Sequence, residues 1–496
     1  MKTSLRVLVL LATAVVAFQA GQRHGVLAIG DAPVQIDSGL IVGVAGIDPE
    51  VRVFKGIPFA APPVGRYRWS APRAVARWEG IRKAAEFSAS CPQATRTGAA
   101  ALLPTSPRLT PSDEDCLYLN VWTAAKAQNA RLPVMVYFPG GGFTAGGGSG
   151  LVFDGEALAQ KGVVLVTVNY RLGVFGFFAH PELSRESGHS ASGNYGLMDQ
   201  AESLRWVQKN IAAFGGDPNR VTIFGQSAGA SSVAYQMASP QVKGLFHRVI
   251  AESGGPSITP LKTLRVAEQA GVKLAESLSA RTIDDLRAKP WTELLKASTG
   301  TGVIVDGWFL PEQMDTVFQK GRQNDVPLLV GSNSHEANVL LRASVLPAQA
   351  YVEQARTQYG RLFDSYMKLY PTGSDELAKE SQFNAFNDTY AWRTRTWARW
   401  QTSTGKSRAY LYYFTRQSPA DGPFAGAAHD AELYFVFRNL RLFKQSWSDW
   451  DRQLEDIISS YWVNFATNGD PNGGRLPQWT AYRNDQNNEV MTLGDQ

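Results

Sequence analysis

The chain has 496 residues, of which 44% are hydrophobic and 19% are charged, and its formal net charge is +5 at pH 7. This composition allows a large buried core, arranged as one big domain or two ordinary ones. Because Lys and Arg form no continuous stripe, we expect no nucleic-acid partner, although a weak attraction to anionic cell surfaces stays open.

The amino terminus has the pattern of a signal peptide. A short positive segment, residues 1–6, precedes an apolar run over residues 7–18, and small residues follow at Ala17, Ala20 and Ala28. The run is shorter than the roughly 20 residues that a spanning helix needs, so we expect no membrane span. We therefore assign residues 1–28 to an export signal, cleaved after one of these three alanines; a retained amphipathic anchor is the alternative.

The remaining residues, 29–496, contain no evident linker and no repeat of fixed period, so we expect a single domain. The chain has two cysteines, Cys91 and Cys116. In an oxidising compartment an isolated pair favours a disulfide, and neither cysteine lies in a CxxC pattern or near a histidine. We therefore expect a secreted or periplasmic protein with one structural disulfide. The spacing of the cysteines argues against a metal role for them, and we expect no metal.

A glycine run follows the apolar strand predicted over residues 134–138. The segment 139–143 reads Pro-Gly-Gly-Gly-Phe. Because glycine has no side chain, the backbone amides at the end of this strand are not shielded. Bare amides can approach a substrate carbonyl and stabilise the charge that develops on its oxygen. A second run, 146–148, shows that a flexible turn is the competing interpretation.

The most informative motif is Gly225-Gln226-Ser227-Ala228-Gly229. A serine between two glycines at a strand-to-helix junction is typical of a nucleophile elbow, which presents a strained serine to its base. Side chains two positions before and after the serine would collide across the turn, so glycine is required there. The amide of Ala228, next to the serine, would face the same oxygen as the glycine run.

The flanking sequence supports this interpretation. An amphipathic helix is predicted over residues 201–214, a turn over 215–218, a buried strand over 221–224 and a second helix over 228–237. This order places the serine at the top of a strand, as an activated nucleophile requires.

The acid is predicted to be Glu336. The apolar run 327–330 leads into a polar segment that ends in His335 and Glu336. In open α/β sheets, functional groups lie at the carboxyl ends of the strands, which is where this polar segment is expected. Neighbouring side chains diverge, so we do not expect His335 and Glu336 to serve one triad together.

The base is predicted to be His429, which lies in a small-residue loop before the apolar segment 431–437. His335 is its main rival. The other histidines lie beside the signal peptide, at an apolar segment's end, in a polar loop or before an apolar strand; they are His24, His180, His189 and His247.

With these residues in place, the chain resembles the type B carboxylesterases, the carboxylesterase and cholinesterase family of α/β-hydrolases. The likeness covers nearly everything after the signal peptide. It rests on blocks that occur in the family's order: residues 54–60, 62–65, 114–122, 169–173, 214–218, the elbow and 468–472.

The resemblance implies a large, mostly parallel central sheet with helices on both faces and inserted helices over the active site. It implies that the nucleophile, base and acid are Ser227, His429 and Glu336, that the oxyanion is held by Gly141, Gly142 and Ala228, and that Ser253 supports the triad from behind. Cys91 and Cys116 match the family's first disulfide. It further implies hydrolysis of small to medium, fairly apolar esters without a cofactor.

Departures from the family pattern bear on specificity. Gln226, Pro139 and the His335-Glu336-Ala337 triplet stand where many members have Glu, His and Asp-Glu-Gly. The segment between the two cysteines contains no aromatic residue, whereas binding of a quaternary ammonium needs an aromatic face. A cholinesterase is therefore not expected. An esterase for polyesters, aromatic esters or toxin esters, and a non-catalytic binding module on this fold, remain as alternatives.

Overall fold

The computed structural model describes residues 32–95, 111–257, 259–297, 302–341, 344–419, 425–483 and 489–495. The expected signal peptide and His24 lie outside these residues. Among the described residues, no helix is both long and apolar enough to cross a membrane.

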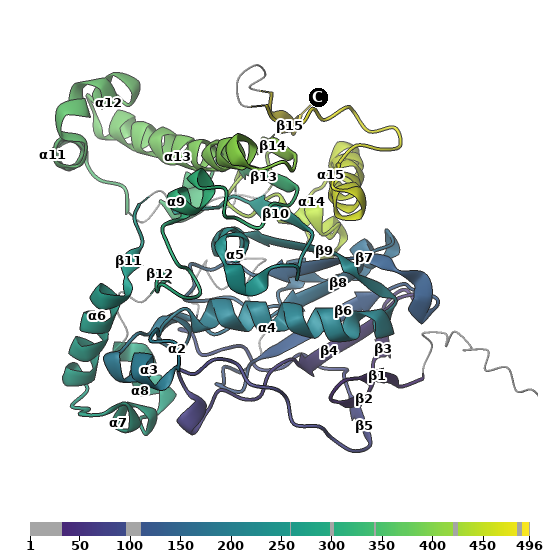
Figure 1. Cartoon of the computed structure of the whole chain (residues 1–496). Coiled ribbons are helices and arrows are strands. Elements are labelled where there is room, and N and C mark those ends of the chain that lie inside the picture. The colour runs from purple at the N-terminus through teal and green to yellow at the C-terminus, as the bar shows by residue number, and fades with distance from the viewer. Residues whose placement is uncertain are drawn as a thin grey trace, which may run out of the picture.

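A ten-stranded sheet forms the centre of the described chain (Figure 1). Its strands, in spatial order, are β15 (Met491–Leu493), β14 (Ala409–Phe414), β13 (Leu328–Asn333), β10 (Arg248–Glu252), β9 (Gly216–Gln226), β7 (Leu132–Phe138), β8 (Val164–Val168), β6 (Tyr118–Thr123), β4 (Arg52–Pro58) and β3 (Val44–Ala45). From β15 to β8 every pairing is parallel, and the pairings that join β8, β6, β4 and β3 are antiparallel. Two small sheets flank it, formed by β1 (Val34–Ile36), β2 (Gly39–Val42) and β5 (Ile81–Lys83), and by β11 (Lys262–Thr263) and β12 (Ile304–Val305).

Both faces of the sheet are buried. Along β7, Val134 and Val136 pack into one apolar cluster, while Met135 and Tyr137 pack into another, as the two-residue period of a strand requires. Helices that contribute to the first cluster include α2 (Gly173–Phe177), α4 (Tyr195–Asn210), α5 (Ala228–Ala238), α7 (Ile283–Arg287), α8 (Trp291–Ala297), α9 (Met314–Gln319) and α13 (Asp375–Thr404). Those of the second include α1 (Glu156–Gln160), α14 (Leu433–Val436) and α15 (Asp449–Asn468). The expected fold class is confirmed.

The segment between β13 and β14 carries the inserted helices. They are α10 (Ala337–Leu340), α11 (Ala348–Tyr359), α12 (Phe363–Leu369) and α13. Figure 1 shows α11 and α12 at the far end of α13, away from the sheet, whereas the other end of α13 lies against β13 and β14. The remaining helices, α3 (Pro181–Glu186) and α6 (Leu264–Ser277), lie at the lower left in Figure 1.

Some predicted boundaries were wrong. The helix expected over residues 201–214 begins earlier, at Tyr195, and α4 ends at Asn210; its last predicted turn is a 3-10 helix that ends at Phe214. Gly215, with φ 79°, closes it. The following strand begins at Gly216, within the predicted turn, because pairing with β7 extends that far. The predicted disulfide between Cys91 and Cys116 is present.

Candidate active site

Ser227 lies in a sharp turn between β9 and α5. Its backbone angles, φ 59° and ψ −121°, are strained for a residue with a side chain. A Cβ atom at Gly225 would lie 2.6 Å from the carbonyl carbon of Gly229, and one at Gly229 would lie 2.0 Å from the carbonyl oxygen of Phe138. The turn therefore needs glycine at both positions, as the sequence predicted. Ser227 itself is partly exposed although Gln226 is buried, so a substrate can reach it.

Glu336 and His429 meet at the carboxyl edge of the sheet, on the segments that follow β13 and β14. A carboxylate oxygen of Glu336 pairs with Nδ1 of His429, and the other oxygen accepts the amide N–H of Asn333 at 2.8 Å. Glu336 is fully buried and His429 nearly so. The second ring nitrogen of His429, Nε2, is buried and has no hydrogen-bond partner among the described residues. A fixed imidazole with one nitrogen unused is suited to take up a proton.

The predicted glycine run lies beside the nucleophile. A Cβ atom at Gly140 would lie 3.1 Å from Cβ of Ser227. Gly141 and Gly142 have φ values of 117° and 63°, which favour glycine. Within the described part of the chain, the amides of Gly141, Gly142 and Ala228 donate no hydrogen bond to a protein acceptor. These three amides can therefore receive an oxyanion.

His335, the rival base, has a structural position. Its amide donates to the carbonyl oxygen of Ala427 at 3.0 Å, and its Nδ1 lies 2.8 Å from Oγ of Ser334. A Cβ atom at Gly426 would lie 3.2 Å from its ring. His335 thus packs against the loop that carries His429, and burial lowers its pKa.

The other described histidines make structural contacts. Nδ1 of His180 caps α3, and Nδ1 of His247 accepts the amide N–H of Val221. His189 stacks on Trp308 with ring centroids 3.7 Å apart. These contacts leave His429 as the base that the geometry favours.

Two buried carboxyl groups, Glu432 near Glu336 and Glu252 near Glu432, were not predicted. Ser253 Oγ donates to Glu432 at 3.3 Å, and the side-chain amide of Asn333 donates to the other oxygen of Glu432. Trp462 Nε1 donates to Glu252 at 2.6 Å. Burial raises the pKa of Glu252 to about 8, and burial together with the nearby carboxylates raises that of Glu432 well above its usual value. Ser253 is thus linked to Glu336 through Glu432 and Asn333.

A sequence signal for Glu432 existed but was weak. The residue is the only acid in the apolar segment 431–437, three positions after His429. A single carboxylate in an apolar run suggests burial, and a buried carboxyl group needs a hydrogen-bond donor. The donors are Ser253, which follows β10, and Asn333, which ends β13. Spacing along the chain does not reveal that these segments meet.

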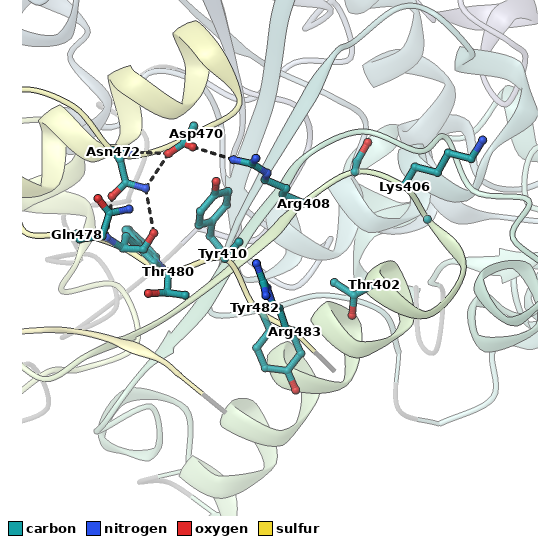
Figure 2. Close-up of a pocket in the computed structure, with 14 residues that line it drawn as sticks. Thr402, Lys406, Arg408, Tyr410, Asp470, Asn472, Gln478, Thr480, Tyr482 and Arg483 are labelled. Carbon is teal, nitrogen blue, oxygen red and sulfur yellow. Dashed lines mark hydrogen bonds and ion pairs between the residues drawn. The ribbon is translucent and has the colours of Figure 1, made fainter. Parts of the chain in front are cut away.

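The cavity drawn in Figure 2 is separate from this site. It has a volume of about 460 Å³, is lined by residues of 402–410 and 470–483, and includes an ion pair between Arg408 and Asp470 at 3.1 Å. None of the triad candidates lines it. Ser227, Glu336 and His429 instead follow β9, β13 and β14 at the carboxyl edge of the sheet. Gly141 and Gly142 follow β7 at the same edge.

Fold and site together define an α/β-hydrolase. The model of the carboxylesterase family matches residues 31–496, and the chain belongs to that family. It is 37% identical to fumonisin B1 esterase of Sphingopyxis macrogoltabida, over 91% of this chain and 85% of the relative. It is 35% identical to para-nitrobenzyl esterase of Bacillus subtilis (strain 168), over 89% of this chain and 91% of the relative.

A solved structure of a PNB esterase superimposes with a TM-score of 0.81 at 33% identity, covering 93% of this chain and 96% of that one. The resemblance read from the sequence is therefore confirmed. The protein is a carboxylic ester hydrolase that acts on small-molecule esters.

Proposed function

We propose that the protein hydrolyses esters by acyl transfer through a triad of Ser227, His429 and Glu336. The observation that carries the proposal is the Glu336–His429 pair, which leaves Nε2 of the imidazole unpartnered in a site that also contains a strained, partly exposed serine. A non-catalytic binding module would not need this arrangement.

In the first half of the reaction, Oγ of Ser227 attacks the ester carbonyl carbon while Nε2 of His429 takes the hydroxyl proton. The carbonyl oxygen becomes an oxyanion, which the amides of Gly141, Gly142 and Ala228 stabilise. When the tetrahedral intermediate collapses, the bond to the alcohol oxygen breaks. The imidazolium gives its proton to that oxygen, and an acyl-enzyme remains.

In the second half, water takes the place of the serine hydroxyl. His429 removes one of its protons, the resulting oxygen attacks the acyl carbon, and Ser227 leaves with the proton. The carboxylate of Glu336 stabilises the imidazolium in both halves and fixes which ring nitrogen carries the proton. No redox step is involved.

The protein is further proposed to be exported, with residues 1–28 as the signal peptide and 29–496 as one folded domain. The disulfide supports an oxidising compartment, since disulfides persist there. N-terminal sequencing of exported protein would identify the cleavage point.

The substrate preference is proposed to be for small to medium, fairly apolar esters. A toxin ester is the second candidate, because the chain is 37% identical to a fumonisin B1 esterase. Rates on aryl and alkyl esters of graded chain length, compared with the rate on fumonisin B1, would distinguish the two.

The triad is tested by Ser227→Ala. We expect ester turnover to fall by at least about a thousandfold with unchanged thermal stability, because the nucleophile is lost. Labelling by a fluorophosphonate should disappear in the same variant. Ser277→Ala, at an exposed serine on α6, is the matched control. Near-normal turnover by Ser227→Ala would refute the assignment.

A further inference from the structure

The inserted helix α13 contacts two of the segments that carry the proposed triad. Oδ1 of Asn387 accepts the amide N–H of Ala337, the residue after Glu336, at 2.9 Å. The ring of Tyr390 lies edge to face with that of His429, with centroids 5.4 Å apart. Because residues three apart are neighbours on a helix surface, both contacts come from one side of α13.

Arg393, three residues further along α13, binds the segments around Ser227. Its Nε donates to the carbonyl oxygen of Pro256 at 2.6 Å. Its Nη2 donates to Oγ of Ser231 at 3.0 Å and to the carbonyl oxygen of Gly255. One side chain thus ties α13 to both α5 and the turn after β10.

Both acceptor segments of Arg393 touch the nucleophile. The amide of Ser231 donates to the carbonyl oxygen of Ser227 at 3.0 Å. A Cβ atom at Gly254 would lie 2.4 Å from that same oxygen, so the turn 254–256 packs directly on Ser227. A shift of this turn would therefore displace the nucleophile.

Arg393 forms no ion pair with an acidic side chain among the described residues, and its guanidinium is used to hold main-chain and hydroxyl oxygens. A guanidinium offers five N–H donors in a rigid planar fork, whereas an ammonium offers three donors on a single nitrogen. Trp397, one turn further, fills the space next to Gly255: a Cβ atom there would lie 2.9 Å from its ring. Arg393 and Trp397 therefore both hold this turn against α13.

We propose that Asn387, Tyr390 and Arg393 are positioning residues, through which α13 sets the relative placement of Glu336, His429 and Ser227. The inference rests on the proposed triad. A displacement of about 1 Å in such a constellation costs about a hundredfold in rate, so the helix affects kcat without touching the reacting atoms.

The test compares Tyr390→Leu with Tyr390→Phe, and Arg393→Met with Arg393→Lys. For each purified variant we would measure kcat and KM on an aryl ester, the rate of fluorophosphonate labelling, and thermal stability. Tyr390→Leu and Arg393→Met should each lose about tenfold in kcat and in labelling rate with KM nearly unchanged. Tyr390→Phe keeps the ring and should stay near the parent, and Arg393→Lys should fall between.

The control is Arg399→Met, at an exposed arginine on the same helix. It should leave every readout unchanged. If Tyr390→Leu does not fold, Asn387→Ala and Arg393→Lys test the same inference. Each of these variants removes hydrogen bonds of α13 without leaving a large cavity in the core.

The two proposals can fail separately. If the parent enzyme is not labelled at Ser227, the proposed triad is wrong. If Ser227 is labelled but the α13 variants keep the parental kcat and labelling rate, with only thermal stability lowered, α13 merely packs and the positioning inference is overturned. An equal loss in Arg399→Met would overturn it as well.

Discussion

Gln226 precedes Ser227, the proposed nucleophile, and its side chain binds the main chain of His429, the proposed base. Its side-chain amide donates to the carbonyl oxygen of His429 at 2.5 Å, and it is nearly fully buried. Many members of the family that the sequence resembles have glutamate at this position. A carboxylate carries no hydrogen, so it cannot donate a hydrogen bond to a carbonyl oxygen. The amide is therefore suited to this contact at all pH values.

Gln226→Glu should lower the free energy of unfolding by about 1 to 3 kcal/mol at neutral pH, because a buried acceptor loses its donor. The value of kcat should fall with it. The deficit should shrink as pH falls, since a protonated glutamate can donate again. Urea unfolding and kcat at several pH values test this, with Gln319→Glu, at an exposed position, as control. Equal stability at alkaline pH would contradict the prediction.

Glu252 is expected to make stability depend on pH. It is fully buried, with Trp462 as a donor, and burial raises its pKa to about 8. The folded state therefore keeps a proton that the unfolded state loses near its usual value of 4.5. The stabilisation is complete below that value and is lost as pH rises through about 8.

The variant Glu252→Gln should remove this dependence. Between about pH 5 and pH 8, the urea midpoint of the variant should rise relative to that of the parent. Above about pH 8 the difference between the two midpoints should stay constant. Glu276→Gln, at an exposed glutamate on α6, should show no such trend. A constant difference across this range would show that Glu252 is ionised in the folded protein.

At the scale of elements, the elbow depends on close contact between β7, β9 and α5. A Cβ atom at Gly229 would lie 2.0 Å from the carbonyl oxygen of Phe138, which is main chain and cannot turn aside. The first turn of α5 therefore needs a residue without a side chain at position 229, so that the helix can pack against the end of β7.

Gly229→Ala should lower the free energy of unfolding by about 2 to 3 kcal/mol through overpacking, and should reduce kcat because the elbow shifts. Gly373→Ala is the control, since a Cβ atom there would meet nothing closer than 4.0 Å. Thermal unfolding and ester hydrolysis measure both effects. A stable, fully active Gly229→Ala enzyme would show that the elbow is looser than the structure indicates.

At the scale of the whole molecule, the disulfide links two positions next to the antiparallel strands of the sheet. Cys91 and Cys116 are 25 residues apart, and both are buried beside β6. Their bond constrains the unfolded chain. Replacing both with serine should lower the free energy of unfolding by about 3 kcal/mol, and the parent under reducing conditions should lose a similar amount. Unchanged urea midpoints in both experiments would contradict this.

The sequence by itself determined the local parts of the site. The elbow and the glycine run could be predicted because each depends on backbone conformations and close approaches that only glycine allows at Gly225, Gly229, Gly141 and Gly142. These requirements act within a few residues, so they leave a pattern in the sequence. The apolar runs that become β7, β9 and β13 were visible for the same reason.

Only the tertiary structure decided how distant segments meet. The ring of His429 reaches Glu336 because β13 and β14 are neighbours in the sheet, and 93 residues separate the two side chains. The burial of Glu252 and Glu432, and the contacts of α13 with four separate segments, follow from the same packing. Such contacts form between surfaces brought together by the sheet, and spacing along the chain does not encode them.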